Sequence, residues 1–266
     1  MKIPKEDLFI SVVGEPELRD HFFELDIKDN MEIPLFVLPE ILDGPWQDYV
    51  RKIKGLLTTK GLRCGVHGPF HGLSYSCIDP LVREVAERRM RQGLQIASEL
   101  DAEFIVFHST YNQYIPDADY ASKWPSNAKK GFQSVVDEGQ KRKILMVLEN
   151  VFDDRPEPTR DLLDLLQSDF LKVCIDVGHL NVFSKVPLRE WFEVLSGDIR
   201  HFHLHNNFGT TDDHHALNNG NFDFEELFGL IDRYHVEAAY TIEVSKLKDV
   251  EPSLGYLREM GILESS

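Results

Sequence analysis

The chain has 266 residues, 42% of them hydrophobic, so it can bury one large core, and its formal net charge is −16. This charge disfavours a broad nucleic-acid surface, because binding to a phosphate backbone usually draws on a basic face, although it does not exclude a local basic groove. The three cysteines form no close pair and are typical of reduced thiols, so we expect a cytoplasmic protein. The sequence shows neither a secretory leader nor an apolar run of membrane-spanning length.

Short apolar runs alternate with segments of helical spacing along the whole chain. We predict strands at 8–13, 31–37, 62–67, 104–108, 144–149, 173–176, 201–205 and 239–244. Helices are predicted between and after them, at 16–26, 46–61, 79–100, 158–168, 187–196 and 222–235. Two more follow the strands at 104–108 and 239–244 and end near residues 142 and 260. Asp79 is expected to cap the third of these helices with Pro80 at its first position, and Gly61 to end the second.

Eight strand–helix units of about thirty residues each indicate a parallel sheet, since the strands are apolar enough to be covered on both faces. Eight such units close into a single (β/α)₈ TIM barrel, which we predict as one domain over residues 1–266. A doubly wound sheet would require a glycine-rich phosphate turn after the first strand, and that turn, SVVGEPEL, has one glycine.

From the middle of the chain onward, the predicted strands end in histidine, aspartate or glutamate. The residues at or just after strand ends are His67, His108, Glu149, Asp176, His179, His203, Asp212, His214 and Glu243. In a parallel barrel all carboxyl ends of strands meet at one rim. Any one of these residues could be an ordinary loop residue, but the acids together would repel one another unless cations compensated them. Mixed imidazole and carboxylate ligands suit Zn²⁺, Mn²⁺ or Fe²⁺ rather than Ca²⁺, and we expect two or more ions.

The motifs around these residues resemble those of the xylose-isomerase-like TIM barrels, a superfamily that holds sugar isomerases and epimerases together with endonuclease IV. VHGPF, VFHS, LENVF, CIDVGHL, HFHLHNN, DDHHALNNG and TIEV occur in the order of that family, over nearly the whole chain. In the endonuclease IV branch, the resemblance implies that all nine residues hold three metal ions. In the epimerase branch, it implies that one ion is held by a quartet, Glu149, Asp176, His203 and Glu243. There Glu149 and Glu243 would also be the catalytic residues that move the proton.

Two functions therefore remain open. The first is a metal-dependent isomerase or epimerase of a small sugar, polyol or sugar phosphate. The second is a phosphoester hydrolase of the endonuclease IV (apurinic endonuclease) type, which the complete set of nine favours. The acidic composition and the short loops after the second and third strands favour the small-molecule enzyme, which we prefer. A non-catalytic metal-binding module is disfavoured, because ligands at a barrel mouth are typical of catalysis.

Four further residues are candidate substrate contacts, although ordinary hydrogen bonding would also explain each of them. They are His71, Asn150, His205 and Lys246. His201, His203 and His205 share one face of a strand, since side chains alternate with period two. His215 neighbours His214, and a shift of one residue would exchange their roles.

Overall fold

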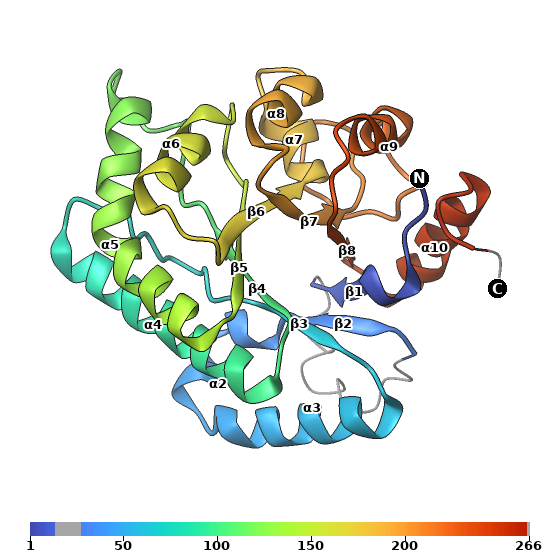
Figure 1. The fold of residues 1–266 in the computed structure, drawn as a ribbon, viewed down its shortest axis with the longest axis horizontal. Coiled ribbons are helices and arrows are strands. Elements are labelled where there is room, and N and C mark those ends of the chain that lie inside the picture. Colours follow the sequence, from blue (N-terminus) through green and yellow to red (C-terminus); the bar gives the residue numbers. More distant parts are fainter. Residues whose placement is uncertain (14–27, 265–266) are drawn as a thin grey trace.

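The computed structural model describes residues 1–13 and 28–264, in which eight strands form a closed parallel barrel (Figure 1). The strands are β1 (Leu8–Val12), β2 (Asn30–Ile33), β3 (Cys64–His67), β4 (Phe104–His108), β5 (Leu145–Glu149), β6 (Leu171–Asp176), β7 (Ile199–Leu204) and β8 (Ala239–Val244). The barrel closes where β1 pairs with β8, from Leu8 opposite Tyr240 to Val12 opposite Val244. The predicted (β/α)₈ TIM barrel is confirmed.

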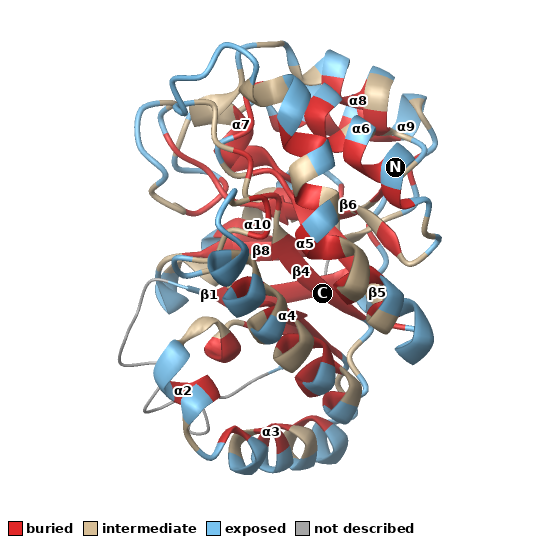
Figure 2. Cartoon of the chain, turned by 90° about the vertical axis from the view of Figure 1, so that its left-hand side faces the viewer, coloured by how far each residue is buried: buried red, intermediate tan, exposed pale blue. Residues whose placement is uncertain are grey.

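Helices surround the barrel and turn their apolar faces toward the strands, while their outer faces are exposed (Figure 2). They are α2 (Pro39–Asp43), α3 (Trp46–Lys60), α4 (Pro80–Leu100), α5 (Tyr120–Arg142), α6 (Glu157–Leu166), α7 (Val177–Phe183), α8 (Leu188–Leu195), α9 (Phe224–Arg233) and α10 (Val250–Glu259). The Asp79 side chain accepts a hydrogen bond from the Leu81 amide at 2.8 Å, and Gly61 ends α3 in a left-handed conformation, as predicted. The helix predicted at 16–26 lies outside the described residues. None of the described helices is long and apolar enough to cross a membrane.

The apolar core has two separate parts. The larger part fills the space between strands and helices. The smaller part lies among Phe9, Phe104, Val106, Val147 and Cys174, inside the barrel, where the Phe9 and Phe104 rings meet edge to face at 5.1 Å. Because these phenylalanines stand near the amino ends of their strands, they plug that end of the barrel. The carboxyl ends of the strands are left for polar side chains.

Two local differences from the predicted elements affect the functional site. The run 31–37 is not one strand: β2 ends at Ile33, and Leu35–Val37 forms a 3₁₀ turn, η3. The reason is Pro34, which has no amide hydrogen for the strand ladder. The second difference is α7, which no prediction included. It starts directly after β6, where the Asp176 side chain caps it by accepting from the His179 amide at 2.7 Å.

The barrel plug leads to a stability prediction. A Cβ at Gly65 in β3 would overlap the Phe104 ring, which is itself held between Phe9 and His201. We therefore expect Gly65→Ala to lower the free energy of unfolding by about 1–3 kcal/mol, through overpacking. Gly229→Ala is the control, because a Cβ there meets nothing within 4 Å and α9 should gain about 0.5–1 kcal/mol. Urea denaturation measures both, and an unchanged Gly65→Ala would contradict this packing.

Candidate metal centre

All nine residues predicted at strand ends gather at the carboxyl-terminal mouth of the barrel, in three neighbouring groups, two of which share Glu149. The first is the quartet Glu149, Asp176, His203 and Glu243, the second is His67, His108 and Glu149, and the third is His179, His205, Asp212 and His214. Within each group, one potential ligand atom per residue lies within 4.8 Å of every other. Segments far apart in the sequence meet here because the carboxyl ends of all strands lie at the same end of the closed barrel.

The quartet surrounds a single imidazole nitrogen with carboxylate oxygens. His203 Nδ1 lies 3.4 Å from Glu149 Oε1, 3.6 Å from Asp176 Oδ2 and 3.3 Å from Glu243 Oε2. This nitrogen is buried and has no hydrogen-bond partner. Buried polar atoms are almost always satisfied. An unpartnered nitrogen facing three carboxylates therefore fits a cation at their centre.

The second group shares Glu149 with the quartet. The other oxygen of that carboxylate, Oε2, lies 3.5 Å from His67 Nε2 and 3.3 Å from His108 Nε2. His67 Nδ1 lies 3.0 Å from the Gly68 carbonyl, to which it donates, so Nε2 faces the mouth. Burial lowers the pKa of His108 to about 3, against the opposing pull of Glu149, so this ring is neutral. Glu149 can thus bridge two ions, one on each oxygen.

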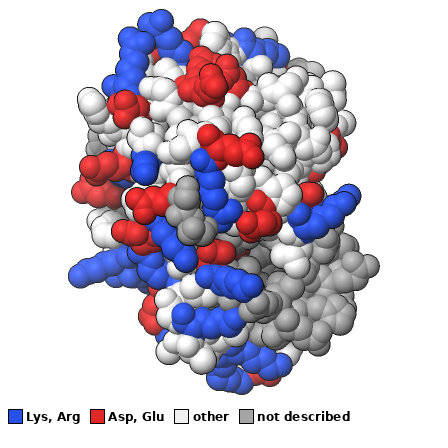
Figure 3. Space-filling model, turned by 90° about the vertical axis from the view of Figure 1, so that its right-hand side faces the viewer, with Lys and Arg blue, Asp and Glu red and all other residues white. Residues whose placement is uncertain are grey.

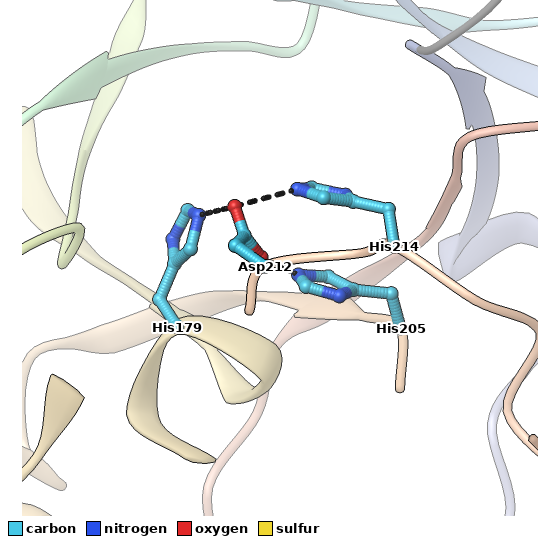
Figure 4. Close-up of side chains that lie close together, drawn as sticks. All are labelled: His179, His205, Asp212 and His214. Carbon is cyan, nitrogen blue, oxygen red and sulfur yellow. Dashed lines mark hydrogen bonds and ion pairs between the residues drawn. The ribbon is translucent and has the colours of Figure 1, made fainter. Parts of the chain in front are cut away.

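The third group is formed by α7 and the loop between β7 and α9, as Figure 4 shows. His179 and His214 point toward the same Asp212 oxygen, Oδ2, with their Nε2 atoms 3.0 and 3.2 Å from it. The His205 ring stacks on that of His214, with centroids 3.7 Å apart. His205 Nε2 also lies 3.0 Å from Asp176 Oδ1, which connects this group with the quartet.

The facing charges control the ionisation of the site. Burial alone would raise the pKa of Glu149, but His203 and His179 outweigh it and lower that pKa well below the usual range. Histidines likewise outweigh burial and lower the pKa values of Asp176, Asp212 and Glu243. Conversely, carboxylates outweigh burial and raise the pKa values of His179 and His214, and Cys174 does so for His203 together with Glu32, Glu243 and Glu149. The acids are therefore ionised. Protonated histidine rings balance their negative charge, and bound cations would replace the ring protons in that role.

The candidate substrate contacts fall in different environments. His71 and Lys246 are exposed, and their role stays a prediction. Asn150 contacts the backbone of Asp176: Nδ2 donates to the Asp176 carbonyl at 3.0 Å, and Oδ1 accepts from the Asp176 amide at 2.9 Å. Its role as a substrate contact stays a prediction. His205 lies among the potential ligands of the third group. His214, and not His215, faces Asp212.

The sequence analysis missed one acid of the site, Glu32. This side chain is fully buried on β2, with Oε2 3.1 Å from His203 Nε2 and 2.7 Å from Thr241 Oγ1. The predicted strand ran to residue 37, so Glu32 lay in its interior and not at its end, where the candidate residues were sought. Pro34 was the available signal, because a strand that stops before proline has Glu32 at its end, like the other acids.

A family model described as "Xylose isomerase-like TIM barrel" matches residues 22–264, and the chain belongs to this family. Among solved structures, a D-tagatose 3-epimerase-like protein shares 22% identity and a TM-score of 0.79, with 95% of this chain and 96% of that chain covered. A Thermus thermophilus protein soaked with ZnCl₂ shares 25% identity and a TM-score of 0.75, over 96% and 97% of the two chains. An uncharacterised protein of Methanocaldococcus jannaschii is 27% identical over 203 residues, or 73% of this chain and 68% of that protein.

The ionisation of the site predicts how stability depends on pH without metal. Burial would lower the pKa of His67, but the facing Glu149 carboxylate outweighs burial and raises it to about 9. Its stabilising contribution is thus complete below about pH 6.5, the value for an unfolded histidine, and is lost as pH rises toward 9. We expect the free energy of unfolding in the presence of a chelator to fall over this interval.

His67→Asn should make that decline shallower by up to about 1.4 kcal/mol per pH unit, the slope that one proton contributes. Denaturant titrations at several pH values measure the slope. His71→Asn, which changes an exposed histidine, is the control and should leave the slope as it is. A stability that rises from pH 6.5 to 9 without metal would contradict the ion pair.

Proposed function

We propose that this protein is a divalent-metal-dependent isomerase or epimerase of a small sugar, polyol or sugar phosphate. The observation that carries the proposal is the quartet, in which three ionised carboxylates surround the unpartnered His203 Nδ1. Three carboxylates and one imidazole form a hard ligand set that suits Mn²⁺ or a similar ion. The similarity to a D-tagatose 3-epimerase-like protein supports the choice of substrate class.

The chain's own residues would perform the proton transfer. A bound ion would polarise the substrate carbonyl and its neighbouring hydroxyl. Glu149 and Glu243 are both ionised and buried, and they reach the mouth from the separated strands β5 and β8. One carboxylate takes the proton from the carbon beside the carbonyl, and the other, once it has taken up a proton from solvent, gives that proton to the opposite face of the carbon. The result is inversion at this carbon, which is the chemistry of an epimerase.

The charge of the protein favours a small substrate over a nucleic acid. The net charge is −16, and the face drawn in Figure 3 intersperses lysine and arginine with aspartate and glutamate. A duplex-binding surface would instead concentrate basic side chains along one track. The mouth itself is lined by carboxylates and histidines, which a neutral polyol can approach without charge repulsion.

One observation favours a second function, a phosphoester hydrolase of the endonuclease IV type. The second and third groups lie beside the quartet, and Glu149 and Asp176 each face two groups. A one-ion epimerase has no need of six further ligands. Several ions held close together could generate a hydroxide nucleophile and stabilise a leaving oxygen. The two functions therefore differ in how many of the three groups hold metal.

Substitution of the glutamates tests the proton transfer. Glu149→Gln and Glu243→Gln should each lower kcat for the epimerised sugar by about 10²–10⁴-fold or more, because each loses a general base and a charged ligand. His67→Ala should cost less, since it leaves the quartet complete. Deuterium uptake from D₂O at the inverted carbon, followed by NMR with a ketohexose panel, measures the transfer. Equal loss in all three variants, with turnover of phosphodiesters only, would establish the hydrolase instead.

Metal occupancy separates the two functions independently of activity. We expect at least two metal positions in the mouth, with the quartet filled at the lowest metal concentration because it offers the most carboxylates. Elemental analysis of metal-replete protein gives the number, and anomalous scattering gives the positions. A single ion in the quartet favours the epimerase, and a full cluster favours the hydrolase. A mouth that takes up no divalent ion would contradict both.

A further inference from the structure

Glu32 takes no part in the proton transfer, yet it is a fully buried carboxylate in contact with the quartet. Its Oε2 accepts a hydrogen bond from Thr241 Oγ1 at 2.7 Å and lies 3.1 Å from His203 Nε2. Thr241 Oγ1 in turn lies 2.9 Å from His201 Nε2. Oε2 is already the acceptor for the Thr241 hydroxyl, and a carboxylate oxygen accepts hydrogen bonds. The contact with His203 therefore has one direction, in which the ring donates its Nε2 proton to Glu32.

We infer that Glu32 is a positioning residue that fixes the tautomer of His203 for metal binding, an inference that rests on the proposed function. A neutral imidazole has one protonated nitrogen and one nitrogen with a free electron pair. Because Glu32 holds the proton on Nε2, the free pair is on Nδ1. That nitrogen has no hydrogen-bond partner and faces the carboxylates of Glu149, Asp176 and Glu243.

The opposite tautomer is disfavoured by the same contacts. It would direct the free pair of Nε2 against the Glu32 carboxylate and an Nδ1 proton toward the centre of the quartet, where a cation would lie. Glu32 also contributes negative charge behind the ring, which makes Nδ1 a better electron donor. Carboxylates that hold the remote ring nitrogen of a ligating histidine typically change metal affinity by about 10–100-fold.

A metal titration of the full chain tests the inference. Glu32→Gln keeps the size of the side chain, but its amide can either donate to or accept from Nε2, so the tautomer is no longer fixed. We expect its Kd for Zn²⁺, measured by competition with a chromophoric chelator, to rise by about 10–100-fold. Glu99→Gln is the matched control, because it makes the same change at an exposed position near the C-terminal end of α4, outside the three groups. Its Kd should equal that of the wild type.

The wild-type protein provides a second measurement that does not depend on any variant. In zinc-loaded protein labelled with ¹⁵N-histidine, NMR should show His203 with a proton on Nε2 and none on Nδ1. A proton on Nδ1, a metal bond to Glu32 in a metal-loaded crystal, or a wild-type Kd in Glu32→Gln would each overturn the inference. If the wild type itself binds no divalent ion, the proposed function and the inference are both wrong. If the wild type binds Zn²⁺ and Glu32→Gln binds it with the same Kd, only the inference is wrong.

Discussion

The repulsion among acids in one barrel mouth is the constraint on which the site depends. Glu32, Glu149, Asp176 and Glu243 are almost completely buried, and each alone would be costly to ionise there. Glu149, Asp176 and Glu243 place oxygens within 4.8 Å of one another, and Glu32 comes as close to Glu243. Histidines from β3, β4, β7 and α7 compensate them, so that every acid faces at least one ring. Such a cluster is stable only while its positive partners are present, either as ring protons or as bound cations.

Backbone and side-chain contacts within the protein hold this cluster in place, so its arrangement does not depend on a bound ligand. Asn150 clamps the backbone of Asp176 through both of its amide atoms, and Asp176 caps α7, which places His179 over the mouth. The phenylalanine plug fills the opposite end of the barrel interior. The charged groups are consequently confined to the other end. The apolar side chains below them give a low local dielectric constant, which strengthens every electrostatic contact.

Sharing of carboxylates makes the three groups one electrostatic unit. Glu149 turns one oxygen to the quartet and the other to His67 and His108, while Asp176 faces both His203 and His205. A change at either bridging acid therefore alters two groups together. Under the proposed function, the number of groups that hold metal, and not the barrel, would decide which of the two reactions is possible.

The sequence by itself determined the barrel and most of the site. Strand periodicity and the repeated acid or histidine after each apolar run depend on local order along the chain, and a parallel barrel then brings all strand ends to one rim. Tertiary structure alone decided the rest. Pro34 is a local signal that ends β2, but barrel closure brought Glu32 against His203, and the stacking of His205 on His214 gave the third group its fourth member. Contacts of this kind join residues as far apart as 32 and 203, and their distances follow from barrel closure and strand register, which no local pattern encodes.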